Sequence, residues 1–225
     1  NPGRHPGCPV GASRRRMSPR GVRESIAAAA ERDVSRETFE KMEAYVAMLR
    51  EEAARQNLVA PSTLDAVWER HILDSAQLVR FAPDARSSWA DIGSGAGLPG
   101  MPIALLSTGP ITLVGPRRLR AEFLRGVVAQ LGIASGVKVE AAKVERIAAK
   151  FDVITARAVA PLGTLLELSA HLSTRKTVWA LPKGRSARTE LAEAQRAWQG
   201  TFHLEPSITG GDSYIIVGTG VGKKP

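Results

Sequence analysis

The sequence predicts an α/β fold with a mostly parallel sheet of seven strands, preceded by a helical extension. Three observations support this fold class. From residue 89 onwards, short apolar runs alternate with amphipathic helical runs, a pattern that favours parallel strands joined by helices. A cluster of glycines follows the first apolar run, where such sheets bind ligands. In residues 19–81 the apolar residues follow only the spacing of amphipathic helices.

The length of the chain fits one such domain with a modest appendage. The 225 residues are 44% hydrophobic, which is enough to bury a full core. We divide the chain into a leader at 1–16, a helical extension at 17–85 and a ligand-binding domain at 86–225. The leader has four arginines, three prolines and three glycines but no acid, so we expect it to be disordered. A basic arm that touches RNA is the alternative.

The overall composition favours a basic cytoplasmic protein with an acidic partner. Lysine and arginine outnumber the acids by 31 to 22, an excess that favours a nucleic-acid partner over a merely basic protein. The single cysteine, Cys8, excludes a disulfide framework and a cysteine-based metal cluster. No apolar run approaches the roughly 18 residues of a membrane span, so we expect no membrane association.

The helical extension contains two amphipathic segments. Ser35 and Thr38 are placed to cap the first, and Pro61 opens the second. We expect these helices to cover the sheet or a ligand cleft rather than to form a second domain. The apolar stripes are Phe39, Met42, Tyr45, Val46 and Leu49 in the first segment, and Leu64, Val67, Trp68, Ile72 and Leu73 in the second.

The stretch WADIGSGAGLPG at residues 89–100 predicts a strand, a tight turn and the start of a helix. Glycines allow positive φ and let a ligand approach the main chain, and the helix start presents free N–H groups. A purely structural turn is one alternative. The spacing from Gly95 to Gly100 also matches the dinucleotide fingerprint G-x-G-x-x-G. However, Asp91 at the strand's end suits a cationic or amine-bearing ligand better than a pyrophosphate. The pattern D-x-G-x-G-x-G resembles the first motif of class I methyltransferases, which bind S-adenosylmethionine.

The remaining elements continue the alternation, and the last two strands form a hairpin-like pair around residues 210–212. Ligands of such sheets lie beyond the carboxyl ends of the strands, where the glycine turn is found. We expect strands at Ile111–Val114, Val137–Ala141, Phe151–Ala156, Thr177–Leu181, Thr201–Leu204 and Tyr214–Val217, and helices at Met101–Leu106, Arg117–Leu131, Pro161–Leu172 and Ser186–Trp198.

Three segments together carry a family resemblance. Residues 57–59 (NLV), residues 70–75 (RHILDS) and the glycine stretch resemble the ribosomal RNA small subunit methyltransferase G family, also called glucose-inhibited division protein B. On chemistry alone, Arg70 and Asp74 have the i, i+4 spacing that could form a surface pair, and His71 is more often a packed or capping residue than a catalytic one. The resemblance spans roughly residues 57–217.

This resemblance implies a Rossmann-like class I methyltransferase fold for residues 86–225 and S-adenosylmethionine as the cofactor. It also implies methylation of guanine N7 in 16S ribosomal RNA, either free or in the 30S subunit. Guanine N7 has an available lone pair, so no general base is needed and we assign no catalytic residue. We expect a monomer without a metal.

The resemblance also assigns cofactor contacts. It places the cofactor against the backbone at Gly93 and Leu98, with the loop shaped by two further glycines. The carboxylate before the loop would face the methionine end, and two residues after the third strand would hold the adenine edge. An arginine after the fourth strand would bind a phosphate or the cofactor carboxylate. The implied positions are Asp91, Gly93, Gly95, Gly97, Leu98, Val144, Glu145 and Arg157.

Basic residues at the same sheet edge are candidates for binding RNA. Lys183, just after the fifth strand, could hold an RNA phosphate or the target base; simple loop solvation is the alternative. Arg117, Arg118, Arg185 and Arg188 could extend a basic rim. Phosphate contacts of this kind make binding weaken steeply with salt, whereas sequence choice must come from RNA shape and a splayed base.

The end of the second strand departs from the family pattern. A methyltransferase of this class normally has an acid there that binds the ribose hydroxyls, and this chain has Gly115. Loss of one charge-assisted hydrogen bond could weaken cofactor binding about ten- to a hundredfold. A site without the acid and with nearby arginines also suits NADP, so an NADP-dependent oxidoreductase is one alternative function. A non-catalytic RNA-binding relic of the methyltransferase fold is the other. Neither Tyr45 nor Tyr214 has the lysine four residues on that a Ser-Tyr-Lys set needs.

Overall fold

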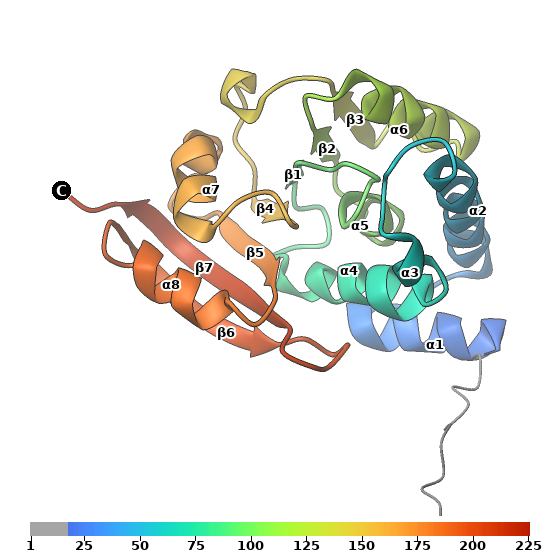
Figure 1. The fold of residues 1–225 in the computed structure, drawn as a ribbon, viewed down its shortest axis with the longest axis horizontal. Coiled ribbons are helices and arrows are strands. Elements are labelled where there is room, and N and C mark those ends of the chain that lie inside the picture. The colour runs from blue at the N-terminus through green and yellow to red at the C-terminus, as the bar shows by residue number, and fades with distance from the viewer. Residues whose placement is uncertain (1–17) are drawn as a thin grey trace, which may run out of the picture.

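The computed structural model describes residues 18–225. They form a central twisted sheet flanked by helices on both faces (Figure 1). The predicted leader at 1–16 lies outside the described residues.

The sheet confirms the predicted fold class. Its seven strands have the order β3-β2-β1-β4-β5-β7-β6, in which β1 to β5 are parallel and β7 is antiparallel to both β5 and β6. The glycine stretch therefore leaves the carboxyl end of a central strand. The strands are β1 (Trp89–Ile92), β2 (Ile111–Val114), β3 (Val137–Glu140), β4 (Val153–Ala156), β5 (Val178–Lys183), β6 (Trp198–Pro206) and β7 (Tyr214–Lys223).

Two apolar clusters fill the two sides of the sheet. One joins the side chains of Trp89, Ile111 and Leu113 to α2, α5 and α6, and the other joins Ile92 and Val114 to α7 and α8. The helices are α1 (Pro19–Ala30), α2 (Arg36–Ala53), α3 (Pro61–Leu64), the π-helix η1 (Trp68–Leu73), α4 (Asp74–Ala76), α5 (Gly100–Leu106), α6 (Arg118–Gln130), α7 (Leu162–Ser169), α8 (Ala187–Ala194) and the 3-10 turns η2 (Gln77–Phe81), η3 (Val144–Arg146) and η4 (Ala170–Leu172).

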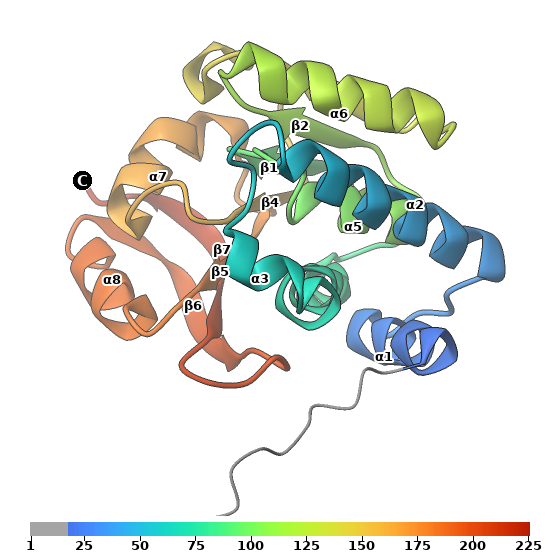
Figure 2. The same ribbon diagram turned by 45° about the vertical axis from the view of Figure 1, so that its right-hand side comes forward.

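The helical extension packs directly onto the sheet. The predicted stripe of α2 is buried, and its Met42 and Tyr45 belong to the same apolar cluster as Ile111 and Leu113. Ser35 caps α2, because its hydroxyl accepts a hydrogen bond from Thr38 N at 3.0 Å. α2 lies beside α6 (Figures 1 and 2). The extension thus shares one core with the sheet.

The C-terminal boundaries differ from the prediction. The helix predicted at Ser186–Trp198 ends at Ala194, and Trp198 begins β6 instead. Trp198 is buried and pairs with Lys223 at the far end of β7, so both final strands are longer than predicted. The long antiparallel pairing decides this boundary. Several residues of β6 are polar and exposed, which makes its strand pattern weak.

Candidate active site

The glycine loop follows β1 and is held by hydrogen bonds from two neighbouring elements. Gly93, Gly95 and Gly97 all have positive φ, at 72°, 54° and 91°. Gly93 N and Ser94 N donate to Val114 O at 2.8 and 3.0 Å, which ties the loop to the end of β2. The buried Tyr45 hydroxyl of α2 donates to Ala96 O at 2.9 Å. The extension therefore helps to fix the loop, a role that the sequence pattern did not indicate.

A pocket of about 320 Å³ lies between this loop, the end of β2 and the start of α6; we call it the loop pocket. Its lining combines bare backbone at Gly93 and Gly95 with apolar side chains, and it includes Arg117 and Arg120. Arg117, predicted as an RNA contact, is thus placed beside the loop. Apolar walls with a few polar groups suit a small organic ligand such as a nucleoside. The apolar side chains are those of Leu113, Pro116, Ala121, Leu124, Val139, Ala158 and Val159.

Asp91 lies buried beneath the loop. Its Oδ2 accepts a hydrogen bond from Gly100 N at 3.1 Å, whereas Oδ1 has no hydrogen-bond partner among the described residues. Burial raises the pKa of Asp91 to about 7, against the opposing effects of Ser94, Gly100 and the Arg157 charge. A buried, unpartnered carboxylate oxygen fits a cationic group nearby, which agrees with the predicted preference for an amine-bearing ligand.

Replacing Asp91 with asparagine is expected to stabilise the fold more at about pH 8 than at about pH 5, relative to the unchanged chain. Because the pKa of Asp91 is raised from 3.8 to about 7 on folding, the native state holds a proton that the unfolded state releases between these values. The stability of the unchanged chain therefore falls as pH rises through this window, whereas the amide does not titrate.

Urea unfolding of both proteins at the two pH values measures this difference. The pKa of His71 is lowered to about 4 by burial, which removes stability as pH falls below about 6.5, but His71 is common to both proteins and its effect cancels. A stability difference that does not change with pH would contradict the assignment of a raised pKa to Asp91.

A second pocket, of about 500 Å³, adjoins the first; we call it the central pocket. It is lined by the segment from Arg157 to Pro161 after β4, by the end of β5 at residues 182–184, and by Asp74 and Glu190. Ala158 and Val159 line both pockets, and a Cβ at Gly93 would overlap the Val159 side chain. The two pockets are therefore separated by only this short segment.

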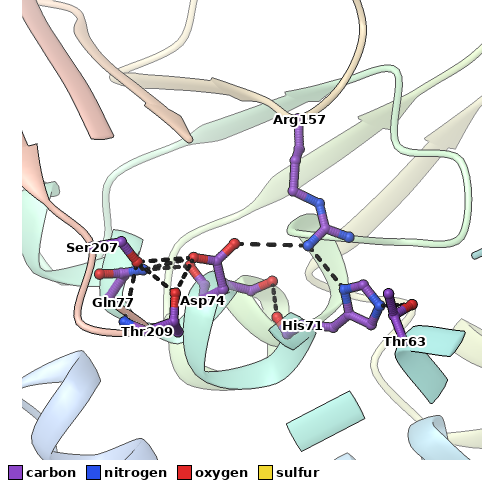
Figure 3. A network of polar contacts seen from close by, with 8 residues as sticks. Thr63, His71, Asp74, Gln77, Arg157, Ser207 and Thr209 are labelled. Carbon is purple, nitrogen blue, oxygen red and sulfur yellow. Dashed lines mark hydrogen bonds and ion pairs between the residues drawn. The ribbon is translucent and has the colours of Figure 1, made fainter. Parts of the chain in front are cut away.

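Arg157, which lines the central pocket, belongs to a polar network with His71 and Asp74 (Figure 3). Its Nη1 lies 3.2 Å from His71 Nδ1 and 3.8 Å from Asp74 Oδ2. Burial, together with the positive charges of Arg157 and Arg70, lowers the pKa of His71 to about 4. The neutral imidazole can then accept from Arg157 at Nδ1 and donate from Nε2 to Thr63 Oγ1, at 2.8 Å. The guanidinium is thus held by a carboxylate and a neutral ring.

Asp74 extends this network to the loop between β6 and β7. Its Oδ1 accepts from Gln77 Nε2 at 3.0 Å, Ser207 Oγ at 3.2 Å and Thr209 Oγ1 at 3.3 Å. The RHILDS segment therefore contributes two side chains that hold the site, His71 and Asp74, whereas chemistry alone predicts a packed residue and a surface residue there. Their partners Arg157 and Ser207 are 86 and 133 residues away, so no local pattern could have shown the pairing.

Lys183 takes part in an internal ion pair. Its Nζ donates to Ala160 O and to Glu190 Oε2, both at 2.8 Å, and its side chain is 11% exposed. Glu190 also accepts from Leu162 N, and the Lys183 charge and these hydrogen bonds lower the pKa of its carboxyl against the effect of burial. The pair fixes the segment that separates the two pockets. RNA binding by Lys183 stays a prediction, and Glu190 was not found from the sequence.

The other predicted site residues are dispersed. Val144 and Glu145 form η3 and do not line the loop pocket, where Val139 and Glu140 of β3 take that place among the described residues. Their predicted contact with the adenine edge stays a prediction. Arg118 is exposed and pairs with Glu122 at 3.5 Å.

Two of the predicted loop residues support the loop from beneath. Leu98 is 4% exposed, and a Cβ at Gly97 would lie 2.6 Å from Met101 Cγ and 2.8 Å from Leu124 Cδ2. Gly97 therefore serves packing, whereas Gly93 and Gly95 face the pocket.

Gly115 lies in the loop pocket at the end of β2, as predicted for the missing acid. A Cβ at this position would meet only Ser94 N, at 4.0 Å. A larger side chain therefore has room.

The sheet order, the antiparallel β7 and the glycine loop beside an apolar pocket define the class I methyltransferase fold, which binds S-adenosylmethionine. The chain belongs to the rRNA small subunit methyltransferase G family, whose model matches residues 38–211. It is 50% identical over 188 residues to "Ribosomal RNA small subunit methyltransferase G" of Sphingopyxis alaskensis, covering 83% of this chain and 80% of that protein. The protein of the same name from Zymomonas mobilis is 46% identical over 200 residues, covering 85% and 90%.

Solved structures share the fold at low sequence identity. A protein of Methanococcus maripaludis that is assigned to the S-adenosyl-L-methionine-dependent methyltransferases has a TM-score of 0.55 at 11% identity, covering 72% of this chain and 93% of that chain. An O-methyltransferase of Bacillus cereus, solved with S-adenosylhomocysteine, has a TM-score of 0.54 at 14% identity, covering 78% and 90%. The protein is an S-adenosylmethionine-dependent methyltransferase, and the comparisons favour neither an oxidoreductase nor a non-catalytic relic.

Two features of residues 18–225 bear on membranes and metals. No helix there is long and apolar enough to span a membrane. The same residues contain no group of three or more His, Cys, Asp or Glu side chains placed to hold a metal ion.

Proposed function

We propose that the protein transfers a methyl group from S-adenosylmethionine to N7 of a guanine in 16S ribosomal RNA. The cofactor occupies the loop pocket and the target base occupies the central pocket. One observation carries this arrangement: the two pockets meet at Ala158 and Val159, at the carboxyl edge of the sheet. Donor and acceptor can therefore meet across that segment. The name of the two relatives supports an RNA of the small ribosomal subunit as the substrate.

The residues around the loop pocket fit the cofactor. The apolar walls receive the adenine, while the bare backbone at Gly93 and Gly95 allows close approach of the ribose and methionine parts. The unpartnered Oδ1 of Asp91 supports a water-mediated or charge contact with the amino group. Arg157 lies near enough to Asp91 to affect its pKa, and we assign its guanidinium, which stays paired with Asp74, to the cofactor carboxylate. Position 115, where the resemblance implies an acid that binds the ribose hydroxyls, is a glycine in this chain.

The chain's contribution to the chemistry is alignment. S-adenosylmethionine supplies an electrophilic methyl group on a sulfonium. Because guanine N7 attacks with its own lone pair, the protein has to hold the base in line and exclude competing orientations. The base gains positive charge, and its pocket is lined by the carboxylates of Asp74 and Glu190, which are paired with Arg157 and Lys183. The lowered pKa of His71 keeps that ring neutral, so it adds no opposing positive charge.

Replacing Arg157 with lysine is expected to raise the KM for S-adenosylmethionine about ten- to a hundredfold, since lysine keeps the charge but loses the two-pronged contact with a carboxylate. Steady-state kinetics at saturating RNA measure this change. Arg36→Lys is the matched control, because Arg36 is exposed and pairs with Glu40 on α2. An unchanged KM for the cofactor with a raised KM for RNA would show that Arg157 contacts the RNA and not the cofactor.

The proposed reaction is tested by transfer of labelled methyl from S-adenosylmethionine into 30S subunits that lack their modifications, and in parallel into free 16S RNA. We expect label at one 16S guanine, mapped by chain cleavage at N7-methylguanine, and we place the reaction in the cytoplasm with the protein acting as a monomer. Label on a ribose, on an exocyclic amine or on no RNA would contradict the proposal.

A further inference from the structure

A third cavity continues the line of the first two; we call it the flanking groove. It has a volume of about 570 Å³ and shares Asp74, Gly184 and Ser213 with the central pocket. The π-helix η1 forms one wall and the loop between β6 and β7 forms the other. Loop pocket, central pocket and flanking groove therefore follow one another along the carboxyl edge of the sheet.

The groove presents two arginines that are not engaged elsewhere in the described part of the chain. Arg70 and Arg185 are exposed at it, and among residues 18–225 neither forms an ion pair or a side-chain hydrogen bond. Other arginines near the site have a role or a partner already, since Arg157 is assigned above to the cofactor carboxylate and Arg120 donates to Asn57 O. Two available guanidiniums at one groove are suited to a phosphate, which arginine binds in two-pronged fashion.

The groove also presents hydrogen-bond acceptors for a base. Glu69 and Asp212 line it, are exposed and form no ion pair within the described residues. Gly210 and Gly211 have positive φ, at 74° and 68°, and a Cβ at either would meet nothing within 4 Å. The loop backbone is thus open to a flat ligand. Carboxylates accept hydrogen bonds from the N–H groups of a base edge and repel a second phosphate.

The two walls are fixed to one another through Asp74. The same carboxylate binds Ser207 and Thr209 of the β6–β7 loop and pairs with Arg157 in the central pocket (Figure 3). Gln77 adds a second tie, because its Oε1 accepts from Ile208 N at 3.0 Å. The flanking groove therefore has a fixed position relative to the central pocket, which is assigned to the target base.

We propose that the flanking groove binds the nucleotide next to the target guanine, with the connecting phosphate on Arg70 and Arg185 and the base edge on Glu69 or Asp212. This inference rests on the proposed function, since it takes the central pocket as the site of the target base. Phosphate contacts alone cannot select an RNA sequence. In this proposal, Glu69, Asp212 and the open backbone at Gly210 and Gly211 make the selection by contacting the base.

The phosphate part is tested with the double variant Arg70→Ala, Arg185→Ala. We expect its affinity for free 16S RNA to fall about ten- to a hundredfold, and the slope of log affinity against log salt to become shallower by about 0.7 for each phosphate that is no longer neutralised. The KM for S-adenosylmethionine should not change. The control, Arg20→Ala with Arg36→Ala, removes the same charge from exposed ion pairs on α1 and α2. Equal reductions in affinity in both double variants would overturn the proposal.

The base part is tested with Glu69→Gln and Asp212→Asn, using short single-stranded RNAs that differ only at the nucleotide beside the guanine. We expect these variants to flatten the preference among the RNAs while leaving the salt slope unchanged. An unaltered preference would overturn the assignment of base selection to the groove. Because RNA affinity is read without methyl transfer, failure of the groove is distinguishable from failure of the proposed reaction.

Discussion

Gly95→Val is expected to abolish detectable binding of S-adenosylmethionine while leaving the protein folded. Gly95 has a φ of 54°, which a β-branched residue adopts only with strain, and it lines the loop pocket. A Cβ there would lie 3.5 Å from Arg120 Nη1 and 3.6 Å from Gly93 O, so the first carbon fits, and we expect the two methyl groups to take up space in the loop pocket. We expect affinity to fall at least about a hundredfold, measured by isothermal titration calorimetry.

Gly132→Val is the matched control for backbone strain. Gly132, just after α6, has a φ of 65°, and a Cβ at this position would meet nothing within 4 Å, so valine imposes similar strain away from the pocket. We expect it to lower the melting temperature without weakening cofactor binding. If Gly95→Val bound the cofactor as tightly as the Gly132 variant does, the loop pocket would not be the cofactor site.

Gly115→Glu is expected to tighten S-adenosylmethionine binding about ten- to a hundredfold, since one or two charge-assisted hydrogen bonds to the ribose contribute roughly 1.5–3 kcal/mol. Space for the side chain is present, because a Cβ at position 115 meets only Ser94 N at 4.0 Å. Calorimetry of both proteins with the cofactor measures the increase in affinity. Faster methyl transfer at low cofactor concentration should accompany it.

The control for added charge is Gly126→Glu, on the exposed side of α6, where a Cβ would meet nothing within 4 Å. This variant should bind the cofactor as the unchanged chain does. If glutamate at 115 gave no increase over the control, another group, such as Glu140 at the end of β3, would already serve the ribose. If it weakened binding, the orientation assigned to the cofactor would be wrong.

Much of the fold could be predicted because its signals are local. The apolar runs of β1, β2 and β4 are short, fully buried or nearly so, and bounded by turn residues, so each is marked by its own sequence. The glycine loop is equally local, since glycine adopts the positive φ angles of Gly93, Gly95 and Gly97 at the least steric cost. The boundary predicted at Trp198 was wrong because pairing with β7, a later segment of the chain, fixes it.

The candidate site was only partly predictable for the same reason. Asp91, Gly93, Gly95 and Arg157 lie at or just beyond the ends of β1 and β4, and the topology of a parallel sheet brings such residues to one edge. The partners of Arg157 come from η1 and α4, and the partner of Lys183 comes from α8, so their roles depend on tertiary packing. Composition and residue spacing do not predict which side chains far apart in the sequence will come into contact.

The most direct test of the two assigned pockets is a crystal structure of the protein with S-adenosylhomocysteine and a guanine nucleotide. We predict that the adenosine lies in the loop pocket against Leu113 and Ala121, and that the sulfur faces the central pocket across Ala158 and Val159, with guanine N7 directed toward it. Cofactor bound elsewhere, or a guanine whose N7 points away from the sulfur, would contradict the assignment of the two pockets.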